Sequence, residues 1–305
     1  MKRKLILLAL AAALLLTACG KTETVNEPTG TPGETPAPTE APAPTETPAP
    51  EASPEGLTPA FIAEDKTEEI RARVAEAAEG VSIREELERV NALSDEYAGY
   101  VSMADTQADM TQLAQWPYLV WDTELNQLWD RLRDTLSPDD MEELTTEELV
   151  WIGLRDEAAA EAVSEFREGS IYPMLYAMQC ADLTRNRAYI LGSVLARGEN
   201  ESFDMPDRGI VGQYLDTAGT DTVHKRLVIK AGMESGYVAV LSVSGVGTAE
   251  GSVERADDGR LLFTGDDPGL TGEIVFGWTG ASFTVKTAGE GPFRAGDVYI
   301  LPTVL

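Results

Sequence analysis

The sequence is poor in the side chains on which much protein chemistry depends. Its 305 residues include only two cysteines and one histidine, so neither a disulfide framework nor a Cys/His zinc site is supported. The histidine, His224, lies in an expected strand, and no nearby serine or cysteine has a nucleophile motif. No glycine-rich run follows an expected strand and opens a helix, which argues against a nucleotide site. We therefore expect no enzyme activity, no metal and no cofactor.

Positive charge is also scarce. Lysine and arginine together number 24 against 52 aspartates and glutamates, which gives a formal net charge of −28. Residues 59–200 carry 12 basic and 30 acidic side chains, whereas residues 201–305 carry 8 and 15. Such a surface repels nucleic acid and anionic lipid and attracts cationic partners, so we expect no nucleic-acid binding. The simpler interpretation is an acidic coat that only keeps the protein soluble, and charge alone favours it.

The N-terminal end is typical of an export signal. Three basic residues at positions 2–4 precede an apolar run over residues 5–16, which is too short for a stable membrane span. The run ends in the tetrapeptide LTAC, which resembles the cleavage site of bacterial lipoproteins. That resemblance implies loss of residues 1–18, palmitate-type acylation of Cys19 and anchoring to the outer face of the cell membrane. The alternative is an ordinary secretory signal with an incidental cysteine.

Residues 19–58 are predicted to be a disordered tether that begins at the acylated cysteine. Proline, threonine, alanine and glutamate dominate the segment, so it cannot bury enough apolar surface to offset the entropy of ordering. Proline at this density favours an extended chain of about 3.1 Å per residue, which gives forty residues a reach on the order of 120 Å. The tether would therefore lift the following domains clear of the membrane.

Residues 59–204 have the apolar periodicity of α-helices. Thr67 is expected to cap a first helix that Gly80 ends, and Ser82 with Glu85 forms a capping box for a second. A further helix is expected to bury its leucines from Leu125 to Leu136. Its solvent side is expected to carry Asp122, Glu124, Asp130, Arg131 and Asp134.

Two longer helices are expected to complete the bundle. Ser137-Pro138 is a start signal, with serine as the cap and proline at the first helical position. The apolar positions expected in the helix that follows are Leu144, Leu149, Trp151 and Ile152. After the turn at residues 169–170, the last helix is expected to use Met174, Leu175, Met178, Leu183 and Ile190. Paired acids between residues 139 and 148 suggest a hydrolase weakly, because adjacent acids on a helix point about 100° apart instead of facing each other across a cleft.

Residues 205–305 change to the two-residue period of strands. Glycine-rich turn signals separate alternating runs, which are Leu227/Ile229, Tyr237/Ala239/Leu241/Val243, Ile274/Phe276/Trp278 and Phe283/Val285. The acid pairs 257–258 and 266–267 fall in turns, where aspartate has a backbone role. We expect an antiparallel barrel or sandwich of about seven or eight strands. The predicted fold is therefore α+β and multidomain: an N-terminal all-α bundle followed by a small all-β antiparallel domain.

An ordered series of short motifs spans the helical region. It runs through WDTELNQLW (residues 121–129), LSP (136–138), WIGLRD (151–156), GS (169–170) and LTRNR (183–187). The series resembles the N-terminal domain of LprI-type lysozyme inhibitors, a small helical module of secreted and lipid-anchored bacterial proteins. Better-known members carry cysteines where this chain has Leu113 and Ala159, so Cys180, their usual partner, stands alone. This chain therefore resembles a cysteine-poor branch, and Cys180 is expected to be a small buried residue.

The resemblance implies that the helical region binds a protein, and a lysozyme-like muramidase is the candidate target. Its polar motif residues have two interpretations: an internal clasp that holds the helices in register, which we favour, or a contact surface. The clasp would comprise Asp122, Asn126, Trp151, Arg155, Thr184 and Arg187. The partner contact is then expected in the irregular loop before the last helix, at Phe166, Glu168, Ser170 and Tyr172.

The function predicted from the sequence is therefore a lipid-anchored extracytoplasmic protein that inhibits a muramidase by charge-steered occlusion. The alternative is a non-inhibitory envelope lipoprotein whose β domain binds glycan or wall material. An exposed aromatic strip formed by Tyr237, Trp278 or Phe283 would favour the alternative, whereas burial of these rings would weaken it.

Overall fold

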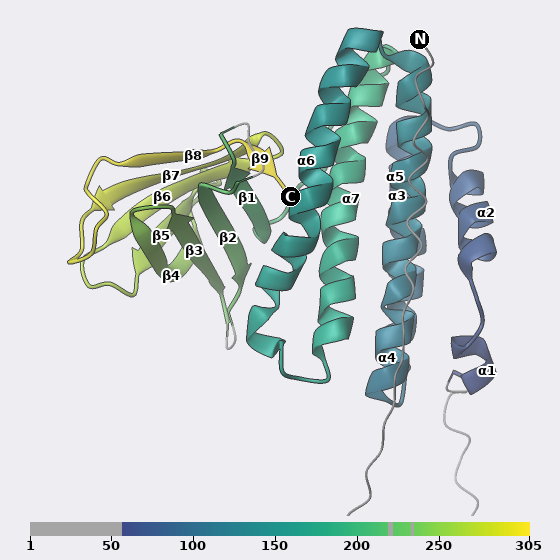
Figure 1. The fold of residues 1–305 in the computed structure, drawn as a ribbon, viewed down its shortest axis with the longest axis horizontal. Coiled ribbons are helices and arrows are strands. Elements are labelled where there is room, and N and C mark those ends of the chain that lie inside the picture. The colour runs from purple at the N-terminus through teal and green to yellow at the C-terminus, as the bar shows by residue number, and fades with distance from the viewer. Residues whose placement is uncertain (1–56, 219–221, 233–234) are drawn as a thin grey trace, which may run out of the picture. The chain divides into compact units, whose positions relative to one another are not determined.

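The computed structural model of the protein describes residues 57–218, 222–232 and 235–305. The expected signal peptide, Cys19 and the tether as far as residue 56 lie outside these ranges. Contacts divide the chain into two units, and Ala52–Leu305 is one of them. The helices and the sheet therefore belong to the same compact unit (Figure 1).

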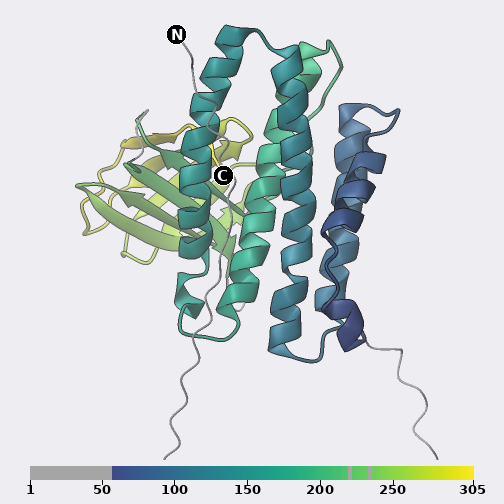
Figure 2. The same cartoon turned by 45° about the vertical axis from the view of Figure 1, so that its right-hand side comes forward.

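The helices all precede the strands. Helices α1 to α7 make up the helical region, in which α1 and α4 are the shortest (Figures 1 and 2). Their bounds are α1 Pro59–Ile62, α2 Thr67–Ala77, α3 Ile83–Val101, α4 Gln107–Leu113, α5 Gln115–Thr135, α6 Pro138–Ala162 and α7 Tyr172–Gly198, with a 3₁₀ turn at Ser164–Phe166. Helix α5 packs most extensively against α7 and also contacts α2 and α3, while α6 packs against α7. Within the described ranges, none of these helices has the length and apolar character needed to cross a membrane.

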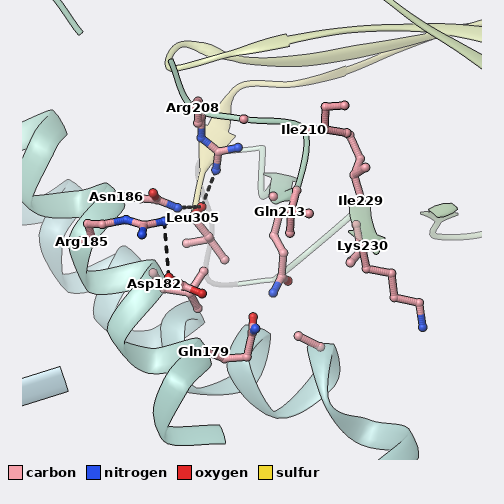
Figure 3. A pocket seen from close by; sticks show the side chains of 16 residues that line it. Gln179, Asp182, Arg185, Asn186, Arg208, Ile210, Gln213, Ile229, Lys230 and Leu305 are labelled. Carbon is pink, nitrogen blue, oxygen red and sulfur yellow. Dashed lines mark hydrogen bonds and ion pairs between the residues drawn. The ribbon is translucent and has the colours of Figure 1, made fainter. Parts of the chain in front are cut away.

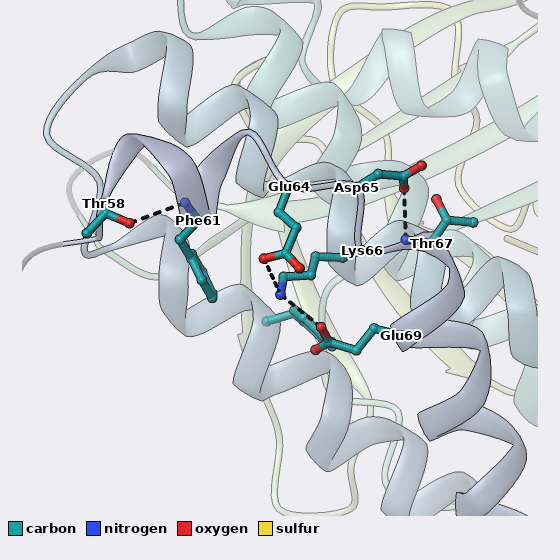
Figure 4. A network of polar contacts seen from close by, with 8 residues as sticks. Thr58, Phe61, Glu64, Asp65, Lys66, Thr67 and Glu69 are labelled. Carbon is teal, nitrogen blue, oxygen red and sulfur yellow. Dashed lines mark hydrogen bonds and ion pairs between the residues drawn. The ribbon is translucent and has the colours of Figure 1, made fainter.

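The start of α2 differs from the sequence expectation. Thr67 is the first helical residue instead of the cap, and its N–H donates to the Asp65 carboxylate at 3.0 Å. The cap position belongs to Lys66, whose ammonium lies 2.8 Å from both Glu64 and Glu69 (Figure 4). These two carboxylates raise the pKa of Lys66. The Asp65 carboxylate, not a hydroxyl, therefore accepts a bond from the first helical N–H. Two ion pairs hold the buried Lys66 where the chain enters the helix.

Two other helix starts follow the expected capping chemistry. The Ser82 hydroxyl accepts from the Glu85 N–H at 3.2 Å, and the Ser137 hydroxyl accepts from the Asp140 N–H at 3.3 Å. Each serine thereby satisfies one of the amide groups that the first turn of a helix leaves without a partner. Gly80 adopts a φ of 68° between α2 and α3, which is the left-handed conformation that favours glycine. The end of α2 near Gly80 and the start of α3 after Ser82 therefore agree with the sequence expectation.

Helix α5 buries more of its circumference than its apolar stripe predicts. Leu125, Leu128 and Leu132 are buried as expected, but Glu124 is fully buried too, so its placement on the solvent side is wrong. The reason is that α5 is enclosed by α2, α3 and α7 and has little free surface. Arg131, also expected outside, turns inward, and its Nη1 lies 2.8 and 2.7 Å from the two carboxylate oxygens of the buried Glu86.

On both α6 and α7, some residues that the sequence placed at apolar positions are exposed. On α6, Leu149 and Ile152 are 67% and 46% exposed, although the sequence suggested apolar positions. On α7, Met178 is also exposed, whereas Leu183 is buried as expected. Much of the buried face of α7 consists of small residues, namely Ala177, Ala181, Ala188, Gly192 and Ala196. Small side chains allow neighbouring helices to approach closely, and a search for large apolar residues overlooks them.

The β region is one antiparallel sheet of nine strands in the order β8-β7-β6-β5-β4-β3-β2-β1-β9. Only Pro302 separates β8 from β9, and β8 also contacts β1 and β2, so the sheet is nearly closed and barrel-like. The strands are β1 Gly212–Asp216, β2 Lys225–Ala231, β3 Tyr237–Val243, β4 Gly247–Arg255, β5 Leu261–Gly265, β6 Thr271–Gly277, β7 Gly280–Thr287, β8 Val298–Leu301 and β9 Thr303–Val304. The expected helical bundle followed by an antiparallel β domain is confirmed.

The core of the sheet lies where the alternating runs predict it. Inward residues such as Leu227, Leu241, Ile274 and Phe283 are fully buried, because successive side chains of a strand point to opposite faces. Strand β4 gave a weaker signal, since its buried positions Ala249, Gly251 and Val253 are mostly small. Trp278, expected as the end of an alternating run, lies just after β6 and packs against the helical core instead.

The helices and the sheet share buried contacts. Leu215 of β1 and Leu305, which follows β9, belong to the helical core. Gln213 of β1 donates through Nε2 to the Ala158 carbonyl of α6 at 3.0 Å, and Asn186 of α7 donates to the main-chain oxygen of Leu305 at 3.1 Å. The two regions therefore depend on each other for part of their burial.

Candidate functional site

Three of the six motif residues meet at the interface of α6 and α7. The Nε of Arg187 donates to Glu148 Oε2 at 2.7 Å, and both side chains are more than nine-tenths buried. The guanidinium carbons of Arg155 and Arg187 lie 5.5 and 5.9 Å from the Trp151 ring centroid. Trp151 is therefore placed between two cations, one of which has a buried carboxylate partner. With Tyr118, these residues form what we call the motif cluster: Tyr118, Glu148, Trp151, Arg155 and Arg187.

Arg155 extends the motif cluster to α5. Its guanidinium lies 5.5 Å from the Tyr118 ring, and its Nε donates to the adjacent Asp156 at 2.9 Å. Burial, followed by the nearby Asp122 carboxylate, raises the pKa of Tyr118 to about 12. Burial also raises the pKa of Asp122, against the opposing effect of Arg155. The arrangement binds α5, α6 and α7 together through cation–ring and polar contacts.

The other motif residues are less central. The Tyr118 hydroxyl lies 3.4 Å from Asp122 Oδ1, which places Asp122 at the edge of the motif cluster. Asn126 is exposed and donates to the Asp122 carbonyl at 2.6 Å, and Thr184 donates to the Cys180 carbonyl at 2.7 Å. These last two bonds stay within one helix. Sequence reasoning missed Glu148 and Tyr118, since no pattern in the run EELV distinguishes Glu148 from the exposed Glu147.

The loop expected to contact a partner lies on the surface. Phe166 is 39% exposed, and Glu168 and Ser170 are exposed as well. The Gly169 N–H donates to the Phe166 carbonyl at 2.8 Å, which gives the loop a tight turn. Tyr172 opens α7, where its ring stacks on that of Tyr176 with centroids 6.1 Å apart. The loop thus offers one exposed aromatic ring and a defined backbone.

A second exposed surface was not anticipated. We call it the α6 face, and it consists of Glu142, Leu149, Ile152 and Asp156, which are all exposed. Their spacing of three, four and seven residues places them on one side of the helix. Helix α6 contains nine acidic residues and a single arginine. The α6 face therefore presents two large apolar side chains in a strongly acidic setting, a composition found at sites of protein contact.

A family model accounts for part of the helical region. Residues 100–191 match the family described as Lysozyme inhibitor LprI. The match extends from the end of α3 into α7 and includes all six motif residues, the loop and the α6 face. It covers less than half of the chain and ends before the sheet. No curated protein and no solved structure matches the chain at a significant level.

The LprI-like segment lacks the cysteines that its resemblance implies. Leu113, Ala159 and Cys180 are all buried in the helical core. Burial is the largest cause of the raised pKa of the Cys180 thiol, so the thiol is a poor nucleophile.

The other residues that the sequence singled out, as possible catalytic, metal-binding or glycan-binding groups, do not come together in one site. His224 is exposed just before β2, and no group of three metal-ligating side chains occurs within the described ranges. Asp258 and Asp267 accept backbone N–H bonds in their turns. Phe283 is fully buried, while Tyr237 and Trp278 are half-buried. These rings form no exposed strip, which weakens the alternative of a glycan-binding sheet.

Proposed function

We propose that the protein is a lipid-anchored extracytoplasmic inhibitor of a lysozyme-like muramidase. The match of residues 100–191 to a family of lysozyme inhibitors carries this proposal. The acidity of the helical region supports it, since residues 59–200 hold 30 acidic and 12 basic side chains. Muramidases of the lysozyme type are often strongly basic, so charge would steer the two proteins together. Inhibition would follow from occlusion of the enzyme's cleft and requires no bond-making by this chain.

The α6 face and the loop at residues 166–172 are the surfaces we assign to this contact. The motif cluster is internal and can position helices but not reach a partner. Leu149 and Ile152 supply exposed apolar area, and contact energy concentrates in such anchors surrounded by polar groups. The acids around them would set the association rate and its dependence on salt.

The test is inhibition of a basic lysozyme by the unit Ala52–Leu305. The sheet should be kept, because Leu215 and Leu305 complete the helical core. We expect loss of muramidase activity on cell-wall substrate at low ionic strength, and weaker inhibition as salt is raised. A variant with Leu149→Ser and Ile152→Ser should lose inhibition, whereas Val275→Ser, an exposed change on the sheet, should retain it. Full muramidase activity at low salt with excess wild-type protein would refute the proposal.

The membrane anchor is a separate part of the proposal with its own test. Cys19 ends the LTAC tetrapeptide after a short apolar run, and two or more acyl chains would give lasting attachment. We expect the full chain to incorporate labelled palmitate and to sediment with membranes. Cys19→Ala should abolish both. Unchanged membrane attachment of that variant would exclude acylation as the anchor.

A further inference from the structure

A cavity of about 280 Å³ lies between α7 and the first two strands of the sheet (Figure 3). Its wall includes Gln179 of α7, Arg208, Gln213 of β1, Lys230 of β2 and Leu305. It shares no residue with the motif cluster, the α6 face or the loop. Its size is just below the range of about 300–1,000 Å³ that small-ligand sites occupy, so only a small ligand would fit.

Arg208 presents one donor on this wall that has no partner. Its Nη1 donates to the Tyr214 hydroxyl at 2.6 Å. Its Nη2 donates to the main-chain oxygen of Leu305 at 2.7 Å (Figure 3). Its Nε is buried and has no hydrogen-bond partner within the part of the chain that the structure describes. Because the other two nitrogens are held, the Nε–H has a fixed direction.

Gln213 presents an acceptor that is also buried without a partner among the described residues. The side chain is 97% buried, since its exposed fraction is 3%. Its Nε2 donates to the Ala158 carbonyl at 3.0 Å, while its Oε1 has no partner among the described residues. Figure 3 shows the amide end of Gln213 directed toward the space beside Gln179. The bond to Ala158 also settles which end of the amide is oxygen.

Unpartnered buried polar atoms are uncommon, because each loses its hydrogen bonds to water on folding. Here the two residues that carry the open donor and acceptor, Arg208 and Gln213, both line one cavity, and both side chains are held in place by their remaining bonds. Such preorganisation lowers the entropic cost of binding. Gly212 leaves room for the Arg208 guanidinium, because a Cβ at this position would collide with Nη1 of Arg208.

The rest of the lining defines what would fit. The apolar residues are aliphatic and include Leu183, Ile210 and Ile229. Among the residues that the structure describes, none with an aromatic ring on which a sugar could stack lines the cavity. The rim cations already have partners, since Arg185 lies 3.3 Å from Asp182 and Lys230 lies 3.5 Å from Glu165. The two terminal nitrogens of Arg208 already donate to oxygen atoms, and the open atoms of the wall are one donor and one acceptor. A neutral ligand that accepts one hydrogen bond, donates another and carries an aliphatic side chain therefore matches the lining.

We propose that this cavity binds a short, uncharged peptide segment with a small aliphatic side chain. One peptide unit would accept from Arg208 Nε–H through its carbonyl and donate to Gln213 Oε1 through its N–H. The aliphatic side chain would pack on the leucine and isoleucine wall. This site is independent of the muramidase contact, and either proposal can fail without the other.

The test uses the unit Ala52–Leu305 labelled with ¹⁵N, in which the Nε–H signal of Arg208 reports on the donor directly. The probe is N-acetyl-valine methylamide, and D-glucose is the comparison, since it offers hydroxyl donors and acceptors without an amide. We expect the valine diamide to shift the Arg208 Nε–H and Gln213 side-chain signals, with a dissociation constant on the order of 1 mM. Glucose should leave both signals unchanged.

Two variants and a matched control complete the test. Arg208→Lys removes the Nε donor, and Gly212→Ala displaces the guanidinium; each should weaken binding about tenfold, the value of one hydrogen bond. Gly99→Ala is the control, because a Cβ there meets nothing within 4 Å, and it should bind as the wild type does. Tighter binding of glucose, or no shift of either signal in the folded wild type with the diamide, would overturn the proposal.

Discussion

The helical region and the sheet bury different kinds of side chain. The five buried charged residues of the described chain all lie in the helical region, namely Lys66, Glu86, Glu124, Glu148 and Arg187. The core of the sheet is apolar, and its buried polar residues, Gln213 and Thr217, lie on or just after β1. Since the LprI match ends before the sheet, the region that carries the family pattern is also the region with charges in its core.

Four of these five buried charges fall into two arrangements with different consequences, while Lys66 pairs separately with Glu64 and Glu69. Arg187 and Glu148 are one cation and one anion, 2.7 Å apart. Glu86 and Glu124 are two acids that share one nearby arginine, Arg131. Both oxygens of Glu124 lack a hydrogen-bond partner among the described residues. The first arrangement is electrically balanced, whereas the second favours a proton on Glu124, because burial and the Glu86 charge both raise its pKa.

Breaking the Arg187–Glu148 ion pair should have the largest effect on the free energy of unfolding. Glu148→Ala leaves the Arg187 guanidinium buried without its carboxylate, which should lower the unfolding free energy by about 3–5 kcal/mol. Chemical denaturation monitored by circular dichroism measures the loss. The double variant Glu148→Met with Arg187→Met should recover most of it, because an apolar pair of similar volume leaves no unpaired charge. A loss below about 1 kcal/mol for the single variant would mean that water already solvates Arg187.

Glycine substitutions compare the two regions directly. At Gly251 of β4, an added Cβ would collide with the Thr264 carbonyl and approach the Gly265 Cα to 2.6 Å. At Gly192 of α7, it would approach only side-chain atoms, 2.7 Å from Leu87 Cδ1. Paired strands cannot separate locally, whereas a leucine can change rotamer, so Gly251→Ala should cost about 3 kcal/mol and Gly192→Ala about 1 kcal/mol.

The control for both glycine variants is Gly153→Ala, an exposed helical site where a Cβ meets nothing within 4 Å. It should stabilise the protein by up to about 1 kcal/mol, since alanine favours the helix. Melting temperatures and denaturation midpoints of the three variants test the order. Equal costs at Gly251 and Gly192 would show that the helical core is as rigid as the paired strands.

The same difference explains how much the sequence could predict. Alternation placed four strands and their core because most of their inward residues, such as Leu241 or Ile274, are large and apolar. In the helices, periodicity found the leucines of α5 but assigned Glu124 to solvent, because it assumes that a helix has one buried side. The motif residues Trp151, Arg155 and Arg187 indicated where the motif cluster lies. Its main partner, Glu148, needed the three-dimensional pairing of α6 with α7.

The acid-rich arrangement predicts a dependence on pH. Glu124 has a higher pKa in the folded protein than its usual value of 4.5, so the folded state binds more protons than the unfolded state above that pH. The unfolding free energy contributed by this group is complete below pH 4.5 and falls as the pH rises through the folded pKa, by at most about 1.4 kcal/mol per pH unit. Glu124→Gln should remove this decline, as measured by denaturation between pH 4.5 and 8.

The exposed Asp134→Asn on the same helix is the matched control, and it should leave the dependence on pH as in the wild type. A decline that persists unchanged in Glu124→Gln would assign it to other groups. Burial also raises the pKa of Asp122 and is the largest such effect at that residue, so Asp122→Asn would then be the next variant to measure.

A substitution on the exposed side of α6 should have the smallest effect on stability. It tests the surface of the helical region separately from its core. Leu149 is 67% exposed on α6, so Leu149→Ser removes little buried area and should change the unfolding free energy by no more than about 0.5 kcal/mol. The same substitution should weaken inhibition of a basic lysozyme if the α6 face is the contact, because burying exposed apolar area in an interface is favourable. Stability unchanged with inhibition lost would place the function of the helical region on its outside and leave its buried charges a structural role. Inhibition unchanged would instead shift the contact to the loop at residues 166–172, where Phe166→Ser is the corresponding substitution.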